Sequence, residues 1–210
     1  MSSIPIERPP PGEPAWRTAR SRRILAAAMV VLRSEPEAGV SMDRIARAAG
    51  VGKATLYRYF DTKEALLQAC LQEIIDELGR RMEDAEENGD PVPDRLYAIV
   101  SNMVETFSDH LLPLRMVTQD SRELDDAWRW WVRDARRRLV AVIRRHLERG
   151  LRDGVYRDVD LDLVPHMAVG MVRSGVFHAK DFSSRELSER ITIFVLRGCC
   201  ADGAAVADLP

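Results

Sequence analysis

Five residues that follow a glycine-rich turn carry side chains suited to binding a polyanion. The turn is Gly50-Val51-Gly52, and the residues after it that face outward are Lys53, Ala54, Thr55, Tyr57 and Arg58. They combine a cation, a small residue that permits close approach, two hydroxyl groups and a guanidinium. Such groups bind phosphates and the base edges of a DNA major groove. The pattern therefore predicts a DNA-binding surface.

A buried opposite face must hold this segment for those side chains to point outward. With about 100° per residue, Phe60 lies about 40° from Leu56, whereas Ala54 lies at about 160° and Arg58 at about 200°. Leu56 and Phe60 therefore predict the buried side of a short helix over residues 53–60.

Two further short helices are expected before this one. Ile24, Ala28 and Leu32 form an apolar stripe on the first, which ends before Pro36. Ser41 is a good N-cap for the second, whose apolar positions are Met42, Ile45, Ala46 and Ala49. Three helices with glycines between the second and the third fit a helix-turn-helix.

The segment 45–67, IARAAGVGKATLYRYFDTKEALL, resembles the tetracycline-repressor (TetR) family of transcription regulators. The resemblance covers residues from about 18 to 67. Its most specific part is the run Leu-Tyr-x-Tyr-Phe-x-x-Lys-Glu-x-Leu at 56–66. The remaining two thirds of the chain match the family only in helix pattern.

The resemblance implies contacts with operator DNA. The phosphate contacts would come from Tyr57, Tyr59 and Lys63. The residues facing the floor of the groove would be Lys53, Ala54, Thr55 and Arg58. The start of the second helix would approach the DNA backbone with Ser41 and Met42. Packing of the two tyrosines against neighbouring helices is the alternative to phosphate binding.

One residue of this segment departs from the family pattern. Some members carry a cation that reads bases where this chain has Asp43. No base contact is expected from that position.

The rest of the chain also follows the helical period, and no segment alternates as a strand does. Helices are expected from about Lys63 to Asn88, and near 93–110, 112–120, 122–152, 161–180 and 184–202. The fold class is therefore all-α: a three-helix helix-turn-helix DNA-binding domain plus a larger helical domain for ligand binding and dimerisation. We expect a disordered, proline-rich arm at 1–15, the DNA-binding domain at 16–62 and the second domain at 63–210.

An apolar ligand cavity is expected in the second domain. The helix near 122–152 has three tryptophans within four residues, of which Trp128 and Trp131 share its apolar stripe. Large apolar side chains on other helices extend this cluster. The predicted ligand contacts are Met103, Phe107, Met116, Trp128, Trp131, Met167 and Met171. Ordinary core packing is the alternative for each of these residues.

The last two helices are expected to pair two subunits as a four-helix bundle, as the resemblance implies. Small and apolar residues on these helices would allow a close approach. The predicted interface comprises Gly170, Ser174, His178, Ile191, Phe194 and Gly198. Burial of these faces within one subunit is the alternative.

Other patterns argue against further functions. The histidines His110, His146, His166 and His178 lack metal-ligand spacing, and the cysteines form no paired motif. No nucleophile elbow, phosphate loop or dinucleotide motif is found, so we expect no enzyme, metal or cofactor. The arginines at 136–138 and 144–145 are interpreted as a solvated helix face because acidic residues outnumber basic ones in this domain.

The expected cellular location and the distribution of charge along the chain both agree with a DNA-binding protein. The longest apolar run, 24–32, is too short to span a membrane, and we expect no membrane contact and a cytoplasmic location. The net charge is -2, yet residues 1–66 have four more basic than acidic side chains. The first third therefore suits a polyanionic partner.

The predicted function is ligand-responsive regulation of transcription. A homodimer would bind double-stranded, palindromic operator DNA and, as a repressor, release it when an unidentified small molecule occupies the second domain. Activation by ligand is equally compatible with the residues. The rival classes are an architectural DNA-binding protein that has no ligand and an all-α enzyme.

Overall fold

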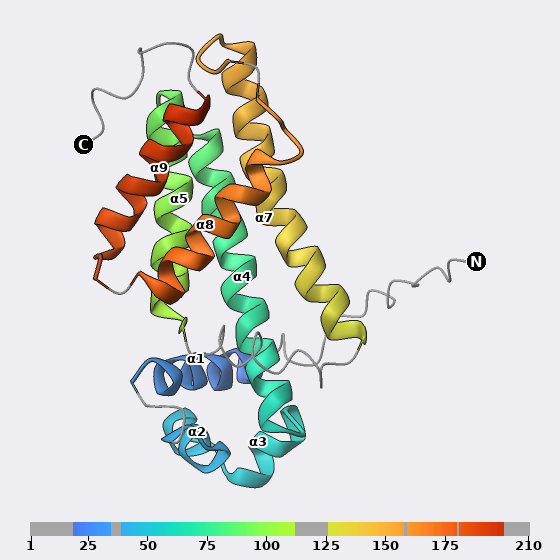
Figure 1. Cartoon of the computed structure of the whole chain (residues 1–210). Coiled ribbons are helices and arrows are strands. Elements are labelled where there is room, and N and C mark those ends of the chain that lie inside the picture. Colours follow the sequence, from blue (N-terminus) through green and yellow to red (C-terminus); the bar gives the residue numbers. More distant parts are fainter. Residues whose placement is uncertain (1–18, 35–38, 112–125, 158, 180, 200–210) are drawn as a thin grey trace, which may run out of the picture. The chain divides into compact units, whose positions relative to one another are not determined.

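The computed structural model describes residues 19–34, 39–111, 126–157, 159–179 and 181–199. The elements within these ranges are helices, which confirms the predicted all-α fold (Figure 1). They are α1 (Ala19–Ser34), α2 (Met42–Ala49), α3 (Lys53–Tyr59), α4 (Lys63–Glu87), α5 (Val92–Asp109), α7 (Asp126–Arg152), α8 (Val164–His178) and α9 (Ser184–Cys199). The expected arm at 1–15 and the helix expected near 112–120 lie outside the described residues.

The chain divides into two compact units, which we call unit 1 (residues 1–70) and unit 2 (residues 71–210). The division falls within α4. That helix therefore contributes its first residues to unit 1 and the rest of its length to unit 2.

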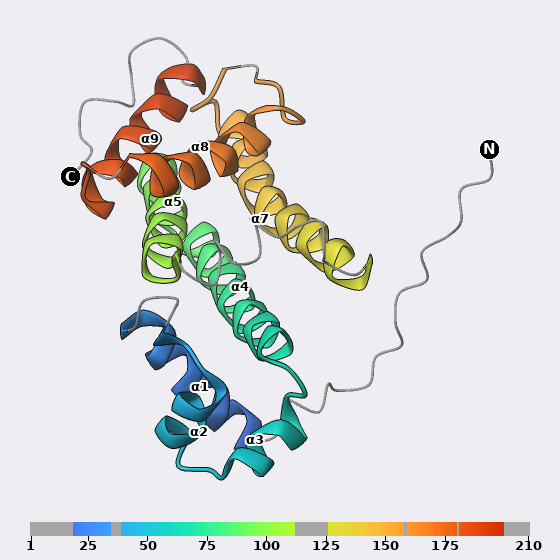
Figure 2. The same cartoon turned by 60° about the horizontal axis from the view of Figure 1, so that its bottom comes forward.

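The three helices at the start of unit 1 form around one small core. On α1, the spacing of Ile24, Leu25 and Ala28 gives a buried stripe, and all three are at most 1% exposed. Ile45 of α2 and Leu56 of α3 are fully buried as well. Figure 2 shows α2 and α3 joined by a short turn beside α1. This core fixes which side of α3 faces outward.

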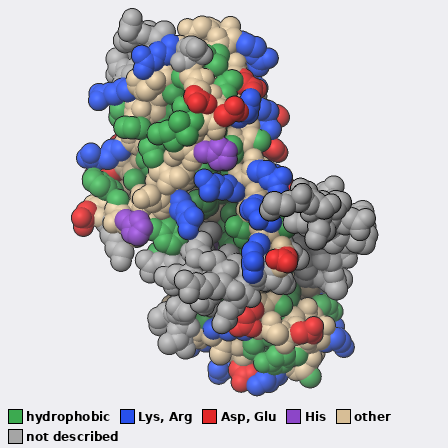
Figure 3. Space-filling model, turned by 45° about the vertical axis from the view of Figure 1, so that its right-hand side comes forward, with side chains coloured by type: hydrophobic (Ala, Val, Ile, Leu, Met, Phe, Trp, Pro, Cys, Tyr) green, Lys and Arg blue, Asp and Glu red, His purple; other side chains and the backbone are tan. Residues whose placement is uncertain are grey.

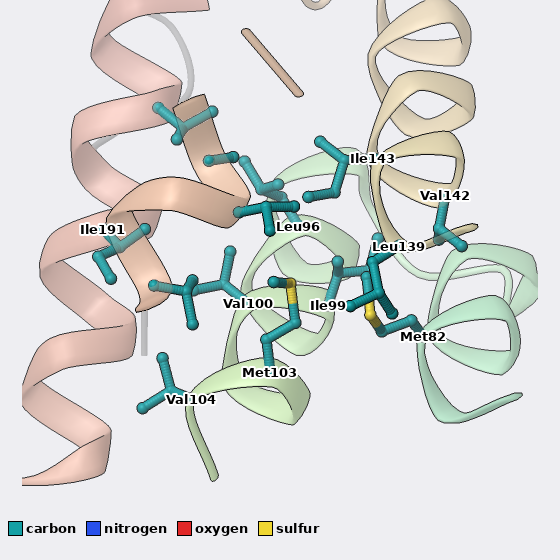
Figure 4. Packing of buried hydrophobic residues seen from close by; sticks show 14 of the residues in the cluster. Met82, Leu96, Ile99, Val100, Met103, Val104, Leu139, Val142, Ile143 and Ile191 are labelled. Atoms are coloured by element: carbon teal, nitrogen blue, oxygen red, sulfur yellow. The ribbon is translucent and has the colours of Figure 1, made fainter. Parts of the chain in front are cut away.

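In unit 2 the apolar stripes of α4, α5, α7, α8 and α9 pack into one core. Figure 4 shows Met82 of α4, Ile99 and Met103 of α5 and Ile143 of α7 among its closely packed side chains. Each of these four residues is fully buried. Close-packed protein cores contain few voids larger than a water molecule, so a larger cavity between these helices is a candidate binding site.

A buried polar network joins α4, α5 and α7. Glu86, 1% exposed, pairs with Nδ1 of His146 at 2.7 Å, while Nε2 of His146 lies 2.7 Å from the hydroxyl of Tyr156. Arg149 lies 3.1 Å and Arg95 3.9 Å from the carboxylate of Glu86. Burial raises the pKa of Glu86, but the hydrogen bond with His146 and the surrounding positive charges outweigh it and lower that pKa below its ordinary value.

Two negative observations bear on function. Among the described residues, no helix has both the length and the apolar composition that crossing a bilayer requires. Within the same ranges, His, Cys, Asp and Glu side chains form no cluster that would hold a metal ion.

Candidate DNA-binding surface and effector cavity

The turn between α2 and α3 is built by local hydrogen bonds. Ser41 caps α2 by accepting the N–H of Arg44 at 3.3 Å, as its N-cap position predicts. At the other end, Gly50 adopts a left-handed conformation with φ of 63°, which suits glycine. The N–H of Gly50 donates to Arg47 O and that of Val51 to Ala46 O, the pattern of a Schellman motif. These bonds set the direction in which α3 leaves α2.

The helix α3 has the two faces that its sequence predicts. Leu56 is fully buried and Phe60, which caps the helix, is 4% exposed. On the opposite side, Ala54, Tyr57 and Arg58 are exposed. Thr55 and Tyr59 are half-buried at the boundary between the two faces. The outward face therefore offers a small residue and a guanidinium with a phenol beside them.

Lys53 forms an ion pair that the sequence did not indicate. Its Nζ lies 2.8 Å from Oδ1 of Asp43, so the pair links the first turns of α2 and α3. The hydrogen bond and the negative charge of Asp43 raise the pKa of Lys53. Part of the positive charge expected at the surface is thus compensated by the residue that departs from the family pattern.

The residues predicted to bind phosphate lie at the end of α3 and the start of α4. Tyr57 is 38% exposed, and the guanidinium of Arg58 lies 5.5 Å from the centre of the Tyr59 ring. Lys63 begins α4, whose first turn is capped by Thr62 through a 3.0 Å bond from the N–H of Ala65. All three candidates therefore stand on capped, regular backbone.

Met42 differs from its predicted neighbours on this surface. Its side chain is only 7% exposed and packs in the core of unit 1, whereas Ser41 is exposed. A DNA contact from Met42 would have to come from its backbone N–H, which lies at the start of α2.

Two arginines that sequence reasoning missed lie beside the turn. An open groove is lined by Ala19, Arg20, Arg23, Gly50, Val51, Gly52 and Thr55. The groove thus joins the first turn of α1 to the turn that begins α3 and places two guanidinium side chains next to backbone amides. The basic run at residues 20–23 was the only signal in the sequence. Because these residues lie about 30 positions before the turn, the sequence did not indicate that they come close to it.

Unit 2 contains an apolar cavity of about 170 Å³ between α4, α5, α7 and α8. Its aromatic walls are Phe107, Trp131 and Phe177. Its aliphatic walls come from α4, α7 and α8. The complete lining is Leu71, Ile75, Phe107, Trp131, Val132, Ala135, Arg136, Leu139, Val169, Gly170, Arg173 and Phe177.

The structure brings together some of the residues predicted to contact a ligand. Phe107 and Trp131 line the cavity, and Trp128 stacks on Trp131 with ring centres 4.6 Å apart. Met103 is fully buried in the core and is not part of the lining. The remaining predicted methionines are placed elsewhere: Met171 is partly buried against the core, Met167 is 46% exposed, and Met116 lies outside the described residues.

Of the residues predicted at the subunit interface, all but Ile191 are exposed. The exposed ones are Gly170, Ser174, His178, Phe194 and Gly198, and Phe194 is 61% exposed. Ile191 is only 7% exposed and belongs to the core of its own chain, where Figure 4 shows it on α9 beside the side chains of α5. Ile191 was misplaced because the apolar surface of α9 is divided: its side chain packs into the core of its own chain, whereas that of Phe194 is exposed.

The close approach of α8 and α9 depends on a glycine that the sequence analysis passed over. A Cβ atom at Gly175 would lie 2.8 Å from the side chain of Leu187, whereas one at Gly170 or Gly198 would meet nothing within 4 Å. Gly170 and Gly198 therefore leave open surface.

Comparisons with known proteins agree with this organisation. Residues 24–70 match the family model described as bacterial regulatory proteins of the tetR family, and residues 89–176 match the tetracyclin repressor-like C-terminal domain. The HTH-type transcriptional regulator YhgD of Bacillus subtilis is 20% identical over 87% of this chain and 98% of its own.

Two solved structures have the same fold. A TetR/AcrR-family regulator from Thermobifida fusca has a TM-score of 0.71 and 24% identity, over 84% of this chain and 97% of its own. The regulator FadR of Bacillus subtilis, solved in complex with stearoyl-CoA, has a TM-score of 0.64 and 21% identity, over 84% of this chain and 98% of its own.

Proposed function

Since the chain is a member of the tetracycline-repressor family of transcription regulators, we propose that it is a repressor controlled by a small molecule. A homodimer binds a palindromic operator through α3, and occupation of the cavity in unit 2 releases the DNA. Members of the family regulate transcription through a helix-turn-helix and are not enzymes.

The outward face of α3 is the observation that carries the proposal. With Leu56 fully buried, Arg58 and Ala54 point away from the core. A helix presented in this way enters a major groove, where a guanidinium can donate two hydrogen bonds to guanine. Tyr57 on that helix and Lys63 at the start of α4 suit contacts with the DNA phosphates.

Three other candidates extend the same surface. Tyr59 and Thr55 stand at the edge of the outward face, and Ser41 lies at the exposed start of α2. Arg20 and Arg23 of the neighbouring groove add positive charge where a phosphate backbone would pass. Together these side chains surround the turn that aims α3.

Two recognition helices are needed to read a palindrome, and a dimer supplies them. The open surfaces of α8 and α9, with Phe194 exposed and Gly170 and Gly198 without neighbours, support pairing through these helices. Burying the exposed Phe194 side chain between two subunits would remove its apolar area from water and so favour pairing. Four helices, two from each subunit, would form the interface.

Release by a ligand is supported by the apolar cavity, which lies in the unit that would also dimerise. A ligand that fits only one arrangement of the dimer shifts the population towards that arrangement. If that arrangement changes the spacing of the two α3 helices, the affinity for operator falls.

The test is selection of bound fragments from genomic DNA by the purified full-length protein. We expect an inverted repeat whose half-sites are about one helical turn, or a multiple of it, apart. Light scattering should give about twice the 23.8 kDa of one chain. Uniform binding of all fragments would instead favour an architectural protein, and a stable monomer would contradict pairing through α8 and α9.

A further inference from the structure

The cavity of unit 2 has a divided chemistry. Its walls are apolar apart from two side chains, Arg136 of α7 and Arg173 of α8, which are the only ionisable groups in the described lining. Both residues are exposed at the surface while they border the cavity. An occupant would therefore meet hydrocarbon inside and positive charge at the edge.

Arg136 of α7 and Arg173 of α8 differ from three arginines of α7 that hold carboxylates of other helices or of their own. Arg138, Arg144 and Arg145 each hold a carboxylate, with the pairs Arg138–Asp76 at 2.8 Å and Arg144–Asp162 at 2.6 Å. No ion pair of Arg136 or Arg173 occurs among the described residues. All three arginines at 136–138 are exposed, as expected, but they differ in their contacts: Arg138 pairs with Asp76 of α4, whereas Arg136 borders the cavity.

Positive and apolar side chains also lie beside one another on the surface of the molecule (Figure 3). In Figure 3, Lys and Arg side chains gather across the middle of the face in view, with hydrophobic side chains visible between them. An acidic group on the ligand would complement the two arginines that border the cavity.

The volume limits the apolar part of the occupant. Sites for drug-sized molecules measure roughly 300–1,000 Å³, whereas this cavity measures about 170 Å³. An engineered cavity of about 150 Å³ with similar walls is enough to bind benzene. One aromatic ring is therefore the size of body that this cavity takes.

The walls also favour a ring. Trp131 forms one wall, and Trp128 stacks on it at an interplanar angle of 10°, so the Trp131 ring is held in place. Phe107 and Phe177 come from two further helices. Aromatic rings pack on one another in offset or edge-to-face arrangements that add to the burial of apolar area.

We propose that the effector is a small aromatic carboxylate, with its ring against Trp131 and its carboxylate between Arg136 and Arg173. The inference rests on the proposed function, because it names the ligand class of the cavity assigned there to the effector. The planar fork of a guanidinium matches the two oxygens of a carboxylate, and two such forks from different helices select for an anion.

The ligand class is tested with the full-length protein and a matched set of probes. Phenylacetate and 3-phenylpropionate are titrated by calorimetry and tryptophan fluorescence against phenylacetamide and phenethylamine, which keep the ring and replace the anion. Hexanoate keeps the anion and replaces the ring. We expect the aromatic acids to bind at least about tenfold more tightly than all three controls, because charged hydrogen bonds are lost or the ring is missing.

The arginines are tested by Arg136→Gln and Arg173→Gln, with Arg137→Gln as the control for charge. Arg137 is exposed on the same helix and does not line the cavity. Each of the first two variants should weaken binding of phenylacetate about tenfold and leave binding of phenylacetamide unchanged, whereas Arg137→Gln should change neither. Equal losses in all three variants would reduce the effect to general electrostatics and overturn the inference.

Phenylacetyl-CoA tests whether the two arginines bind a carboxylate or a phosphate. It keeps the aromatic ring, lacks the free carboxylate and carries phosphate groups. If this thioester binds and the free acids do not, the proposed carboxylate site is wrong. Failure of every aromatic acid to bind has the same meaning.

Operator release, measured by fluorescence anisotropy of a labelled site, separates this inference from the proposed function. A neutral ligand that binds the cavity and releases DNA would overturn the inference and keep the function. An aromatic acid that binds through both arginines without releasing DNA would keep the assigned ligand chemistry of the cavity but overturn release of DNA by that ligand, and with it the role of effector.

Discussion

The surface of α3 and the interior of unit 2 arrange their polar groups in opposite ways. Arg58 and Tyr57 are exposed, and the turn before them is held by bonds within residues 41–51. Glu86, His146 and Tyr156 are buried, and Glu86 meets His146 from 60 residues away along the chain. In the first region a side chain can be removed without disturbing the fold, whereas in the second each group stabilises the others. Binding and stability should therefore respond to different substitutions.

The sharpest contrast is expected from Glu86→Ala. Removing one partner from a buried ion pair leaves the others without compensation and costs about 3–5 kcal/mol. Glu86 faces His146 and the guanidinium groups of Arg95 and Arg149. Urea denaturation at a fixed protein concentration measures the loss. The control is Glu83→Ala, since Glu83 lies on the same helix in an exposed pair with Arg145. An exposed pair contributes about 0–1 kcal/mol, so similar losses in both variants would remove the contrast.

Protonation of Glu86 weakens the same contacts in a milder way. Its pKa is lowered in the folded protein, so its contribution to stability is complete above the ordinary value of 4.5 and is lost as the pH falls through the lower folded value. We expect the free energy of unfolding to decrease as the pH falls below about 4.5. Glu86→Gln should have lower stability at neutral pH and a flatter profile in that range. A profile as steep as that of the wild type would assign the acid sensitivity to other carboxylates.

A pair of glycines in helices tests the packing of unit 2. A Cβ atom at Gly150 would lie 2.1 Å from the ring of Tyr156, whose hydroxyl is tied to His146. Because that ring cannot move without losing its bond, Gly150→Ala should cost about 1–3 kcal/mol by overpacking. A Cβ at Gly79 of α4 meets nothing within 4 Å, and Gly79→Ala should stabilise the helix by about 1 kcal/mol. Thermal unfolding distinguishes them by the direction of the shift in Tm.

The helix cap and the buried face of α3 in unit 1 were predictable because the residues that form each of them lie close together in sequence. The cap at Ser41 and the buried pair Leu56 and Phe60 follow from residue type and the helical period. In unit 2, the end of α4 at Glu87 was predictable in the same way, from Asn88 and the glycine and proline that follow it. Each of these features depends on neighbours within one or two turns.

Tertiary contacts explain what the sequence did not predict. Arg136 and Arg138 look alike in sequence, yet one borders the cavity and the other pairs with Asp76, 62 residues away. The period of α9 places Ile191 and Phe194 on one broad apolar surface, but the core takes only Ile191. The helical period of such a surface does not indicate which of its residues pack against the same chain.

On the outward face of α3, Arg58→Ala should change binding and leave stability within about 0.5 kcal/mol, as for other exposed residues. If Arg58 donates to the O6 and N7 acceptors of a guanine, the loss on the preferred operator is roughly 1–3 kcal/mol, with relaxed preference at one base pair of each half-site. Selection of bound sequences with both proteins provides the measurement. An identical motif with uniformly lower affinity would assign Arg58 to a phosphate instead.

Lys63→Ala complements Arg58→Ala because Lys63 is proposed to bind a phosphate, a contact that does not depend on the base sequence. It should weaken binding to all sequences alike and reduce the slope of log affinity against log salt by about one unit. Titrations of operator and of unrelated DNA over a range of salt concentrations measure both effects. An unchanged slope would remove Lys63 from the phosphate contacts.

The smallest effect is expected from Asp43→Asn, which tests whether the pair with Lys53 restrains the exposed surface. The pair joins α2 to α3 at 2.8 Å, but both side chains are more than half exposed, so little stability should depend on it. The substitution removes a negative charge beside the DNA and frees the Lys53 ammonium for a phosphate. We therefore expect tighter binding to operator and unrelated DNA alike, and a salt slope steeper by about one unit. In the background of Lys53→Ala the gain in slope should disappear, because the freed cation is absent. If Asp43→Asn instead weakens binding to operator alone, the pair positions α3 for reading bases, and the exposed surface depends on a contact between helices just as the interior of unit 2 does.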